Sequence, residues 1–217
     1  MLTLVIGNRN YSSWSLRPWV YLAHHGIRFE ERRIPLYVPG SHEALLEHAP
    51  TGLAPSLQDG EVRVWESIAI LEYLAERFPA TRGWPEDAAA RAHARSISAE
   101  MHAGFRNLRQ ALPMNCRRVV PARVWPAEVQ ADIDRIAAIW TGCRDMKAAA
   151  SGDFLFGHFG VADAMFAPVA FRFRTYSVAL PPAARAYCDA LLALPAMQAW
   201  LAGAVAESET MAKYDSV

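Results

Sequence analysis

Cysteine is scarce in this sequence, and the few cysteines lie far apart. The chain of 217 residues has three, Cys116, Cys143 and Cys188. An odd number without a CxxC pair argues against a disulfide framework and against the usual zinc-binding spacings. The histidines show no metal-ligand pattern either, so the sequence predicts no metal site. We expect all three cysteines to be buried, reduced thiols.

An excess of charge of either sign is also lacking. Lys and Arg together number 22, as do Asp and Glu, so the formal net charge is zero. Such a chain has no global field to hold nucleic acid or an anionic membrane. No apolar run reaches the roughly 18 residues of a membrane span, and the apolar start at 1–7 is too short for a signal peptide. We therefore expect a cytoplasmic protein that binds neither nucleic acid nor membrane.

The chain does have enough apolar sequence for a sizeable core, because 53% of its residues are hydrophobic and 20% are charged. Residues 1–80 show both strand and helix patterns, whereas residues 88–217 show helix patterns alone. The composition changes at 81–85, Thr-Arg-Gly-Trp-Pro. The sequence therefore predicts two domains, 1–80 and 88–217, joined by a short linker.

The first domain begins with a strand, a helix and a second strand. Three elements within 36 residues form a βαβ unit, in which the two strands are parallel. The helix pattern begins at Leu16, which puts Pro18 in the first turn, where its missing N–H costs little. Asp59-Gly60 between two short strands indicates a hairpin. The expected elements are strands at 2–6, 29–36, 56–58 and 62–65, and helices from Leu16 to Gly26, around 43–48 and from Ser67 to 78.

The second domain is expected to be a helix bundle. Apolar residues at helical spacing mark three long helices, the third with Pro168 inside it, and two shorter helices follow. Arg117, Arg118 and Arg123 are interpreted as a solvated basic loop. The expected helices are 94–112, 129–143, 162–176, 182–194 and 195–204.

Three stretches of the first domain carry residues that can do chemistry. The loop 10–15 contains serines that either cap the following helix or donate a hydrogen bond to a thiolate. Ala54-Pro55 precedes a strand, and nothing local forces that peptide bond to be cis. Glu66-Ser67 opens a helix: Ser67 is an N-cap candidate, or the pair holds the carboxylate and ammonium of a ligand. Each signal is weak when taken alone.

Taken together and in order, these stretches resemble the cytosolic glutathione S-transferase family, and the serine cluster before an arginine is nearest to its zeta class. The resemblance implies an α+β fold class: a thioredoxin-like βαβ-α-ββα domain that binds glutathione, followed by an all-helical domain that contributes the acceptor-substrate site. It also implies a homodimer. The matching residues are Ser12-Ser13-Trp14-Ser15-Leu16-Arg17, Gly52-Leu53-Ala54-Pro55-Ser56-Leu57 and Asp59-Gly60 to Glu66-Ser67-Ile68-Ala69-Ile70.

The resemblance assigns glutathione-binding roles by position. Pro55 would be cis, and the backbone of Ala54 would pair with the cysteinyl part of glutathione like an added strand. Glu66 and Ser67 would hold the γ-glutamyl end. Leu53 stands where many members of the family have Lys or Gln, which reach the glycyl carboxylate. This departure weakens the expected binding unless the segment Tyr37–Glu43 or an arginine substitutes for that residue.

A serine at 12 or 13 would stabilise the glutathione thiolate. Free thiols have a pKa of roughly 8.5, and a hydrogen bond to the charged form lowers that value. Ser12 is five residues before Arg17, the zeta-like and tau-like spacing, whereas Ser13 is four residues before it. We favour Ser12 as the thiolate donor and Ser13 as the helix N-cap.

In the helical domain, His102, Phe105 and Arg109 form a stripe beside an apolar helix face, where the family resemblance predicts the acceptor-substrate pocket. His102 has a second interpretation, as a helix-face histidine bonded to a neighbour or to water. Further along, Gly160 replaces the usual hydroxyl residue of a buried capping box, so only the bond to Asp163 is expected to survive.

Three functions remain open at this point. The first is a glutathione transferase that delivers the thiolate to a small electrophile. The second is a zeta-like cis–trans isomerase of the maleylacetoacetate isomerase type, in which the thiolate adds to a double bond, permits rotation and leaves. The third is a non-catalytic binding or scaffold protein, which Leu53 and Gly160 favour. In each case glutathione is the only small molecule besides the acceptor that we expect.

Overall fold

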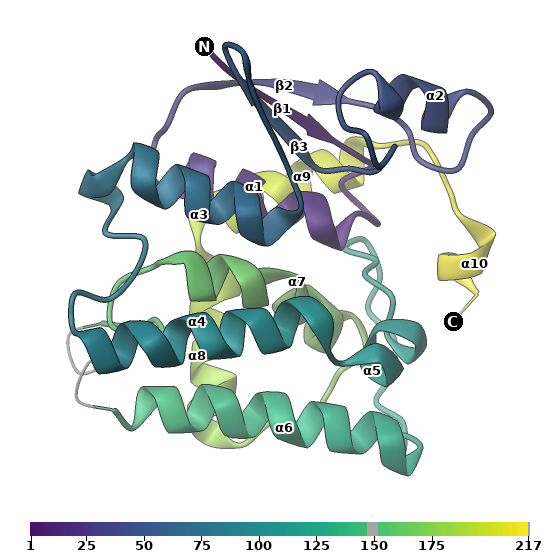
Figure 1. Ribbon diagram of the computed structural model, residues 1–217. Coiled ribbons are helices and arrows are strands. Elements are labelled where there is room, and N and C mark those ends of the chain that lie inside the picture. Colours follow the sequence, from purple (N-terminus) through teal and green to yellow (C-terminus); the bar gives the residue numbers. More distant parts are fainter. Residues whose placement is uncertain (147–151, 217) are drawn as a thin grey trace.

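The chain folds into two layers, a sheet with its helices and a bundle of helices beneath it (Figure 1). The computed structural model describes residues 1–146 and 152–216. In this part of the chain the strands lie within the first 65 residues, and the elements from residue 88 onward are helices apart from isolated bridges at 154–158. The predicted fold class is confirmed: a thioredoxin-like unit followed by a helical part.

The sheet has four strands in the order β2-β1-β3-β4. β1 and β2 are parallel, as the βαβ pattern predicts, and the other pairs are antiparallel. The second strand ends before the predicted residue 36, because the Leu36 N–H bonds to Asn8 Oδ1 (2.8 Å) instead of to the sheet. The bounds are β1 Leu2–Ile6, β2 Phe29–Arg33, β3 Ser56–Asp59 and β4 Val62–Trp65.

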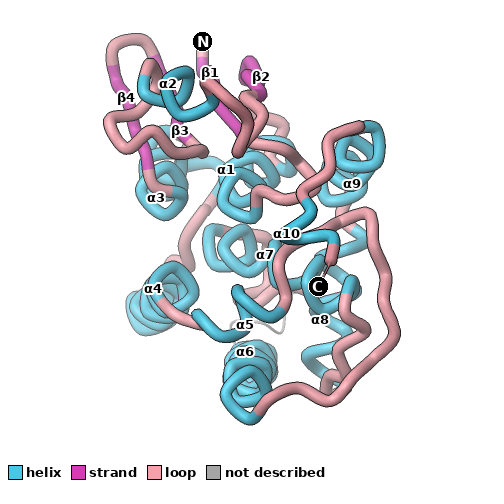
Figure 2. Tube along the Cα trace, turned by 90° about the vertical axis from the view of Figure 1, so that its right-hand side faces the viewer, coloured by secondary structure: helices cyan, strands magenta, loops and turns pink. Residues whose placement is uncertain are grey.

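Two helices of the first part, α1 (Ser13–His24) and α3 (Ser67–Arg77), lie between the sheet and the bundle (Figure 2). α2 (Ser41–Leu46) and a 3₁₀ turn, η1 (Pro79–Thr81), complete this part. α1 begins three residues before the predicted start, since Ser12 caps it. Pro18 is therefore inside the helix rather than in its first turn, which corrects the prediction.

The helix predicted at 94–112 is in fact two helices. α4 (Ala88–Ala103) stops at Gly104, and α5 (Arg106–Ala111) starts after Phe105, whose φ of +59° lies in the left-handed region. A side chain at Gly104 would lie 2.8 Å from a backbone carbonyl oxygen of α4, so glycine allows the close turn. The other long helices agree with the predicted ones: α6 Ala127–Arg144, α7 Val161–Thr175, α8 Pro182–Ala193 and α9 Pro195–Ala206.

α7 is the centre of the molecule and packs against α1, α4 and α8. All of its residues except Arg174 are buried. The predicted half of the capping box is present: Asp163 Oδ2 accepts the N–H of Gly160 at 2.9 Å. Asp163 Oδ1 also accepts from Leu155 N–H and Tyr187 O–H, both at 3.0 Å. These bonds hold the start of α7 against the rest of the bundle.

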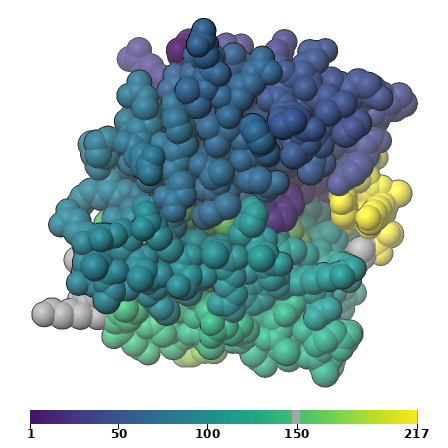
Figure 3. Space-filling model, in the orientation of Figure 1, coloured from purple at the N-terminus to yellow at the C-terminus, as the bar shows by residue number. Residues whose placement is uncertain are grey.

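The chain returns to the first layer at its C-terminal end. α9 packs against α1, and a short helix, α10 (Ala212–Asp215), lies at the boundary between the two layers, where the yellow segment appears in Figure 3. Among the described residues no single helix is long and apolar enough to cross a membrane. α8 and α9 meet that length and composition criterion only together, with a bend of 67° between them.

Candidate functional site

A cavity of about 560 Å³ opens between the two layers. Its walls bring together the N-terminal end of α1, the loop before β3, the start of α3 and parts of the helical bundle. All seven residues predicted to bind or activate glutathione line it: Ser12, Ser13, Leu53, Ala54, Pro55, Glu66 and Ser67. A volume of this size is typical of a small-molecule site.

The Ala54–Pro55 peptide bond is cis, as the sequence resemblance predicts. Pro55 is buried and leads directly into β3, whereas Leu53 is 60% exposed at the cavity rim. Gly52, with φ of +60°, makes the tight turn before this segment. The turn presents the backbone of Ala54 to the cavity.

Glu66 and Ser67 form the opposite wall at the start of α3. Ser67 is the first helical residue, and Glu66, with φ of +70°, occupies the cap position without a side-chain cap bond. This corrects the interpretation of Ser67 as an N-cap. Its Oγ instead accepts a hydrogen bond from Arg17 Nη1 at 3.1 Å. The Ser67 proton is thereby left free to be donated to a ligand.

The two serines of the first loop have different partners. Ser12, not Ser13, is the N-cap of α1, which corrects the predicted assignment: its Oγ accepts from Ser15 N–H at 3.4 Å. Ser12 Oγ also donates to Ser15 Oγ at 2.7 Å. Ser13 is the first residue of the helix, and its Oγ accepts from Arg172 Nη2 at 3.1 Å. Both side chains are almost completely buried, and both line the cavity.

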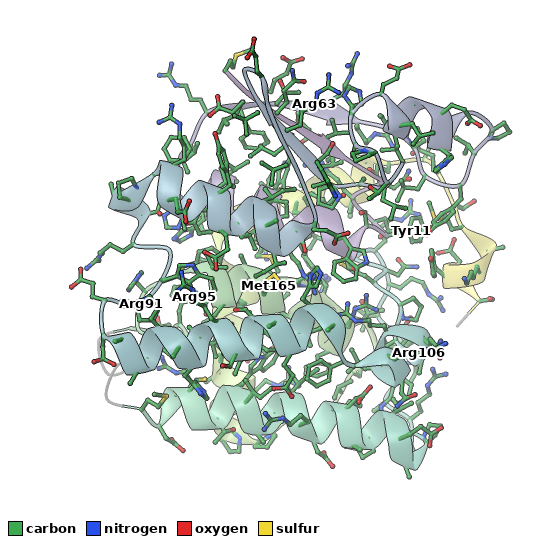
Figure 4. All side chains as sticks on the ribbon, viewed as in Figure 1. Tyr11, Arg63, Arg91, Arg95, Arg106 and Met165 are labelled. Carbon is green, nitrogen blue, oxygen red and sulfur yellow. The ribbon has the colours of Figure 1, made fainter. Side chains whose placement is uncertain are left out.

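Three arginines lie near the serines. Arg17 and Arg172 are only 1% and 5% exposed, and Arg109 is half-buried. Arg17 also donates from Nε to the carbonyl of Met165 on α7 (3.2 Å), in the centre of Figure 4. The guanidinium groups of Arg17 and Arg109 both lie over the ring of Trp14, 4.3 and 4.8 Å from its centroid.

Two carboxylates act on these arginines without forming ion pairs: the charge of Glu66 favours the cationic form of Arg17, and that of Asp132 favours the cationic form of Arg109. None of the ion pairs found among the described residues includes Arg17, Arg109 or Arg172. Burial, the largest cause, lowers the pKa of Arg109 to about 10 and that of Arg172 to about 9, and it also lowers the pKa of Arg17. All three remain cations at neutral pH. Arg109 and Arg172 therefore give their part of the cavity wall a positive charge, whereas Glu66 lines another part.

The structure separates the three residues predicted for the acceptor pocket. Arg109 lines the cavity, but His102 and Phe105 do not. Phe105 is 7% exposed and packs in the apolar core, and its backbone makes the left-handed turn between α4 and α5. His102 contacts Glu66, with 3.6 Å between Nε2 and Oε2, and lies edge-on to Trp14. Desolvation lowers its pKa.

Sequence reasoning assigned no site role to several residues of the lining, among them Tyr11, Arg172 and Tyr214, and it covered His42 only as part of the segment 37–43. His42 Nδ1 lies 3.2 Å from the carbonyl oxygen of Gly52 and so fixes the turn before Ala54. Tyr11, at the right of Figure 4, is close to α10. Arg172 and Tyr214 lie far from residues 10–67 in the sequence, and no motif links them to that region.

The C-terminal segment 207–215, which we call the strap, closes one side of the cavity. Tyr11 O–H bonds to the carboxylate of Asp215 at 2.9 Å, and the two tyrosine rings of Tyr11 and Tyr214 are 5.7 Å apart. The strap is also held by the half-buried Arg117, which donates to the carbonyls of Glu207 and Glu209 at 2.7 and 2.8 Å. The sequence suggested that Arg117 belongs to a solvated loop. That interpretation is wrong, because Arg117 is half-buried and bonds to the strap.

No cysteine is among the residues that line the candidate site, and the described residues form no metal cluster. No group of three His, Cys, Asp or Glu side chains in 1–146 and 152–216 is close enough to hold a metal. The three cysteines are free and buried, and burial raises the pKa of each thiol to about 12. The arrangement is suited to binding a peptide-like anion and to stabilising negative charge.

Comparison with known proteins identifies the family. The sequence profile of the glutathione S-transferase N-terminal domain matches residues 11–77. Glutathione S-transferase GstB of Escherichia coli K12 is 30% identical over 143 residues, which are 64% of this chain and 67% of that protein. The chain belongs to the glutathione S-transferase family.

Other members of the family are similar over shorter stretches. A probable maleylacetoacetate isomerase of Caenorhabditis elegans is 35% identical over 46% of this chain, and one of Vibrio cholerae is 34% identical over 47%. The chain spans about half the length of these two relatives, 46% and 51%.

Solved structures extend the similarity to the whole fold. A glutathione transferase homologue from Burkholderia with bound glutathione superposes with a TM-score of 0.69 at 25% identity, and the match covers 95% of this chain and 99% of that one. A bacterial zeta-class maleyl pyruvate isomerase gives a TM-score of 0.71 at 24% identity over 95% and 100% of the two chains.

Proposed function

We propose that this protein is a glutathione transferase that binds glutathione in the cavity between its two layers, activates the thiol as a thiolate and delivers it to a small, negatively charged electrophile. One observation carries the proposal: the hydroxyls of residues 12 and 13, the backbone before cis-Pro55 and the Glu66–Ser67 pair line one cavity. These elements come from three separate stretches of the chain, and their convergence fits a γ-glutamyl-cysteinyl peptide.

Each part of glutathione has a chemical counterpart in the cavity. Glu66, whose side chain is 51% exposed, accepts the γ-glutamyl ammonium, and Ser67 donates its free proton to the neighbouring carboxylate. The backbone of Ala54 pairs with the cysteinyl unit. His42 takes the place of a Lys or Gln at Leu53 in its doubly protonated form, in which Nδ1 donates to the carbonyl of Gly52 and Nε2 donates to the glycyl carboxylate.

The reaction follows from thiolate chemistry. Binding lowers the thiol pKa, and the thiol proton passes to solvent. The sulfur then forms a bond to the electrophilic carbon, and the bond to the leaving group breaks with its electron pair. The cationic part of the wall favours an acceptor that carries a carboxylate, because Arg109 and Arg172 line the cavity and neither belongs to an ion pair of the described residues.

The same cationic wall favours a second candidate, a glutathione-dependent cis–trans isomerase of an unsaturated carboxylate. In that reaction the thiolate adds to the double bond, rotation occurs about the resulting single bond, and elimination restores the double bond and releases the thiolate. Glutathione is not consumed. The similarity to two probable maleylacetoacetate isomerases supports this candidate.

Calorimetric titration with glutathione, followed by assays with matched electrophiles, tests the proposal. We expect binding to wild-type protein and faster turnover of a carboxylate-bearing acceptor than of its methyl ester. Arg109→Gln should remove most of that preference, whereas Arg106→Gln, a change at the start of the same helix, should leave it intact. Rearranged acceptor without loss of glutathione indicates the isomerase. No binding and no turnover would instead indicate the non-catalytic protein.

A further inference from the structure

Ser12 and Ser13 are adjacent in the sequence, but the structure gives their hydroxyl groups opposite tasks. Ser12 Oγ donates its proton inward, to Ser15 Oγ at 2.7 Å, and accepts a backbone N–H at the helix end. Ser15 is fully buried and also accepts from Gly7 N–H at 3.1 Å. The Ser12 hydroxyl is therefore part of the structural cap of α1.

Ser13 is placed differently, because its oxygen already accepts from a cation. Arg172 Nη2 lies 3.1 Å from Ser13 Oγ, and Arg172 Nη1 is anchored on the carbonyl of Leu112 at the end of α5. A guanidinium can only donate hydrogen bonds, so the Ser13 proton must be donated elsewhere. No acceptor for it is found among the described residues, and the side chain lines the cavity.

A cation behind a hydroxyl also makes that hydroxyl a better donor. Hydrogen bonds that involve an ionised partner are roughly twice as strong as neutral ones, and successive bonds polarise one another in a medium of low dielectric constant. Arg172 is 5% exposed, and none of the ion pairs of the described residues includes it. The Ser12 cap has only neutral partners.

We propose that Ser13, rather than Ser12, donates the hydrogen bond that stabilises the thiolate of bound glutathione, and that Arg172 is the positioning residue that orients and polarises this hydroxyl. The inference rests on the proposed glutathione site. It assigns the role of thiolate donor to Ser13, which is four residues before Arg17. The sequence pattern favours Ser12, which is five residues before Arg17. The thiolate then faces the cations of Arg109 and Arg172 and the Tyr11 hydroxyl that Asp215 holds.

The arrangement has a counterpart at the other end of the cavity. Arg17 Nη1 donates to Ser67 Oγ at 3.1 Å, and Arg17 is 1% exposed. In both cases a buried arginine donates a hydrogen bond to the Oγ of a serine in the cavity wall. The hydroxyl proton of the serine is then available for the ligand. Ser67 would bind the γ-glutamyl carboxylate and Ser13 the thiolate, two of the three anionic groups of bound glutathione.

The thiolate absorbance of bound glutathione, titrated without acceptor, tests the inference and isolates it from any contact of Arg172 with the acceptor. A hydrogen bond to a charged group is worth about 1.5–3 kcal/mol. At about 1.4 kcal/mol per pKa unit, we expect Ser13→Ala to raise the thiol pKa by about one to two units. Arg172→Gln should raise it similarly, Arg172→Lys should restore part of the shift, and the surface control Ser96→Ala should change nothing.

Four further outcomes complete the test. Ser12→Ala should lower the melting temperature and leave the thiol pKa nearly unchanged. The Ser13→Ala, Arg172→Gln double variant should not exceed the larger single shift if the pair acts as a unit. A pKa that rises in Ser12→Ala but not in Ser13→Ala would overturn the assignment while the proposed function stands, whereas wild-type protein that does not bind glutathione would remove the proposed function itself. The Ser13 variants keep the test valid should Arg172→Gln fail to fold.

Discussion

The buried carboxylate of Asp163 accepts three hydrogen bonds, so its removal should lower the free energy of unfolding. Asp163→Ala would leave the N–H groups of Leu155 and Gly160 and the Tyr187 hydroxyl without their acceptor. At about 1 kcal/mol each, we expect a loss of about 3 kcal/mol in the free energy of unfolding. Urea denaturation measures it, with the exposed Asp189→Ala as a control that should stay within 0.5 kcal/mol, roughly the worth of a surface ion pair. A loss below roughly 1 kcal/mol at Asp163 would contradict this account.

His25 should make stability depend on pH. Its ring packs on Tyr21, with 4.6 Å between centroids, and its Nε2 is buried without a partner among the described residues. Burial first, and then the charges of His24 and His158, lower its pKa from 6.5 to about 4. The folded state therefore binds the proton less readily than the unfolded state. The contribution of neutral His25 to stability is complete above pH 6.5 and is lost as the pH falls towards 4.

We accordingly expect the melting temperature to fall between pH 7 and roughly pH 4.5, over the range set by the shifted pKa of His25. His25→Gln removes the titrating group and should flatten this dependence, even if the variant is less stable at pH 7. Thermal unfolding at several pH values in buffers of equal ionic strength provides the measurement. Identical slopes for the two proteins would show that His25 does not cause the effect.

At the scale of the residue, the sequence predicted which side chains meet but not how they divide their tasks. The convergence at 12–13, 54–55 and 66–67 followed from the ordered motifs, and the structure confirms that these residues share a cavity. The N-cap of α1 was assigned to the wrong serine, because both serines are good caps and the choice depends on the backbone. Arg172 was missed, since its partner is 159 residues away.

Among the elements, the strap has several anchors, which include Arg33 and Arg118, and Arg117 is the one that bonds to both the strap and Tyr11. Arg117 Nη2 bonds to the Tyr11 hydroxyl at 2.9 Å as well as to the strap carbonyls, and the N–H of Met211 also bonds to that hydroxyl at 3.1 Å. Arg117→Ala should therefore speed hydrogen exchange at residues 207–215, because free energies of local opening depend on such contacts. Arg123→Ala, an exposed arginine of the same loop, is the matched control. Equal exchange in both variants would contradict the role of Arg117.

The element boundaries that sequence patterns missed have local physical causes. Periodicity alone continued through Gly104-Phe105, because the apolar spacing on either side of the break stays in phase. The turn itself depends on the missing Cβ at Gly104 and on a left-handed residue after it. α10 escaped prediction because four residues carry no periodicity.

At the scale of the whole molecule, we propose a homodimer in which the first domain of one chain packs against the helical domain of the other. β4 is an edge strand, and its Trp65 and Val62 are 40% and 45% exposed. Light scattering should give a mass near twice the 24.1 kDa of the chain. Trp65→Glu should shift the mass towards that of one chain, and Val205→Glu, at another exposed apolar residue, serves as the control. A wild-type mass of 24.1 kDa would contradict the dimer.

The order of elements predicted the architecture as a whole, since strand–helix–strand and a hairpin leave few alternative topologies. The division into domains 1–80 and 88–217 remains a proposal, because α1 packs as closely on α7 as elements of one domain do. The contacts of the strap with the first loop were beyond sequence reasoning, which sees periodicity within elements but not the return of a distant segment.

The return of α9 to α1 bears on how the protein is synthesised. Trp19 of α1 packs against Trp200 of α9, with 5.2 Å between ring centroids, and Arg9 lies against both rings. The ribosome releases the sheet and α1 long before it releases α9. Until α9 emerges, the face of α1 that carries Trp19 stays exposed to solvent. Domains of multidomain proteins fold from the N-terminus as they emerge, and exposed apolar surface makes such species prone to aggregate. A pause in translation between residues 80 and 195 should therefore be harmful to this protein, whereas the same pause after residue 206 should cost little.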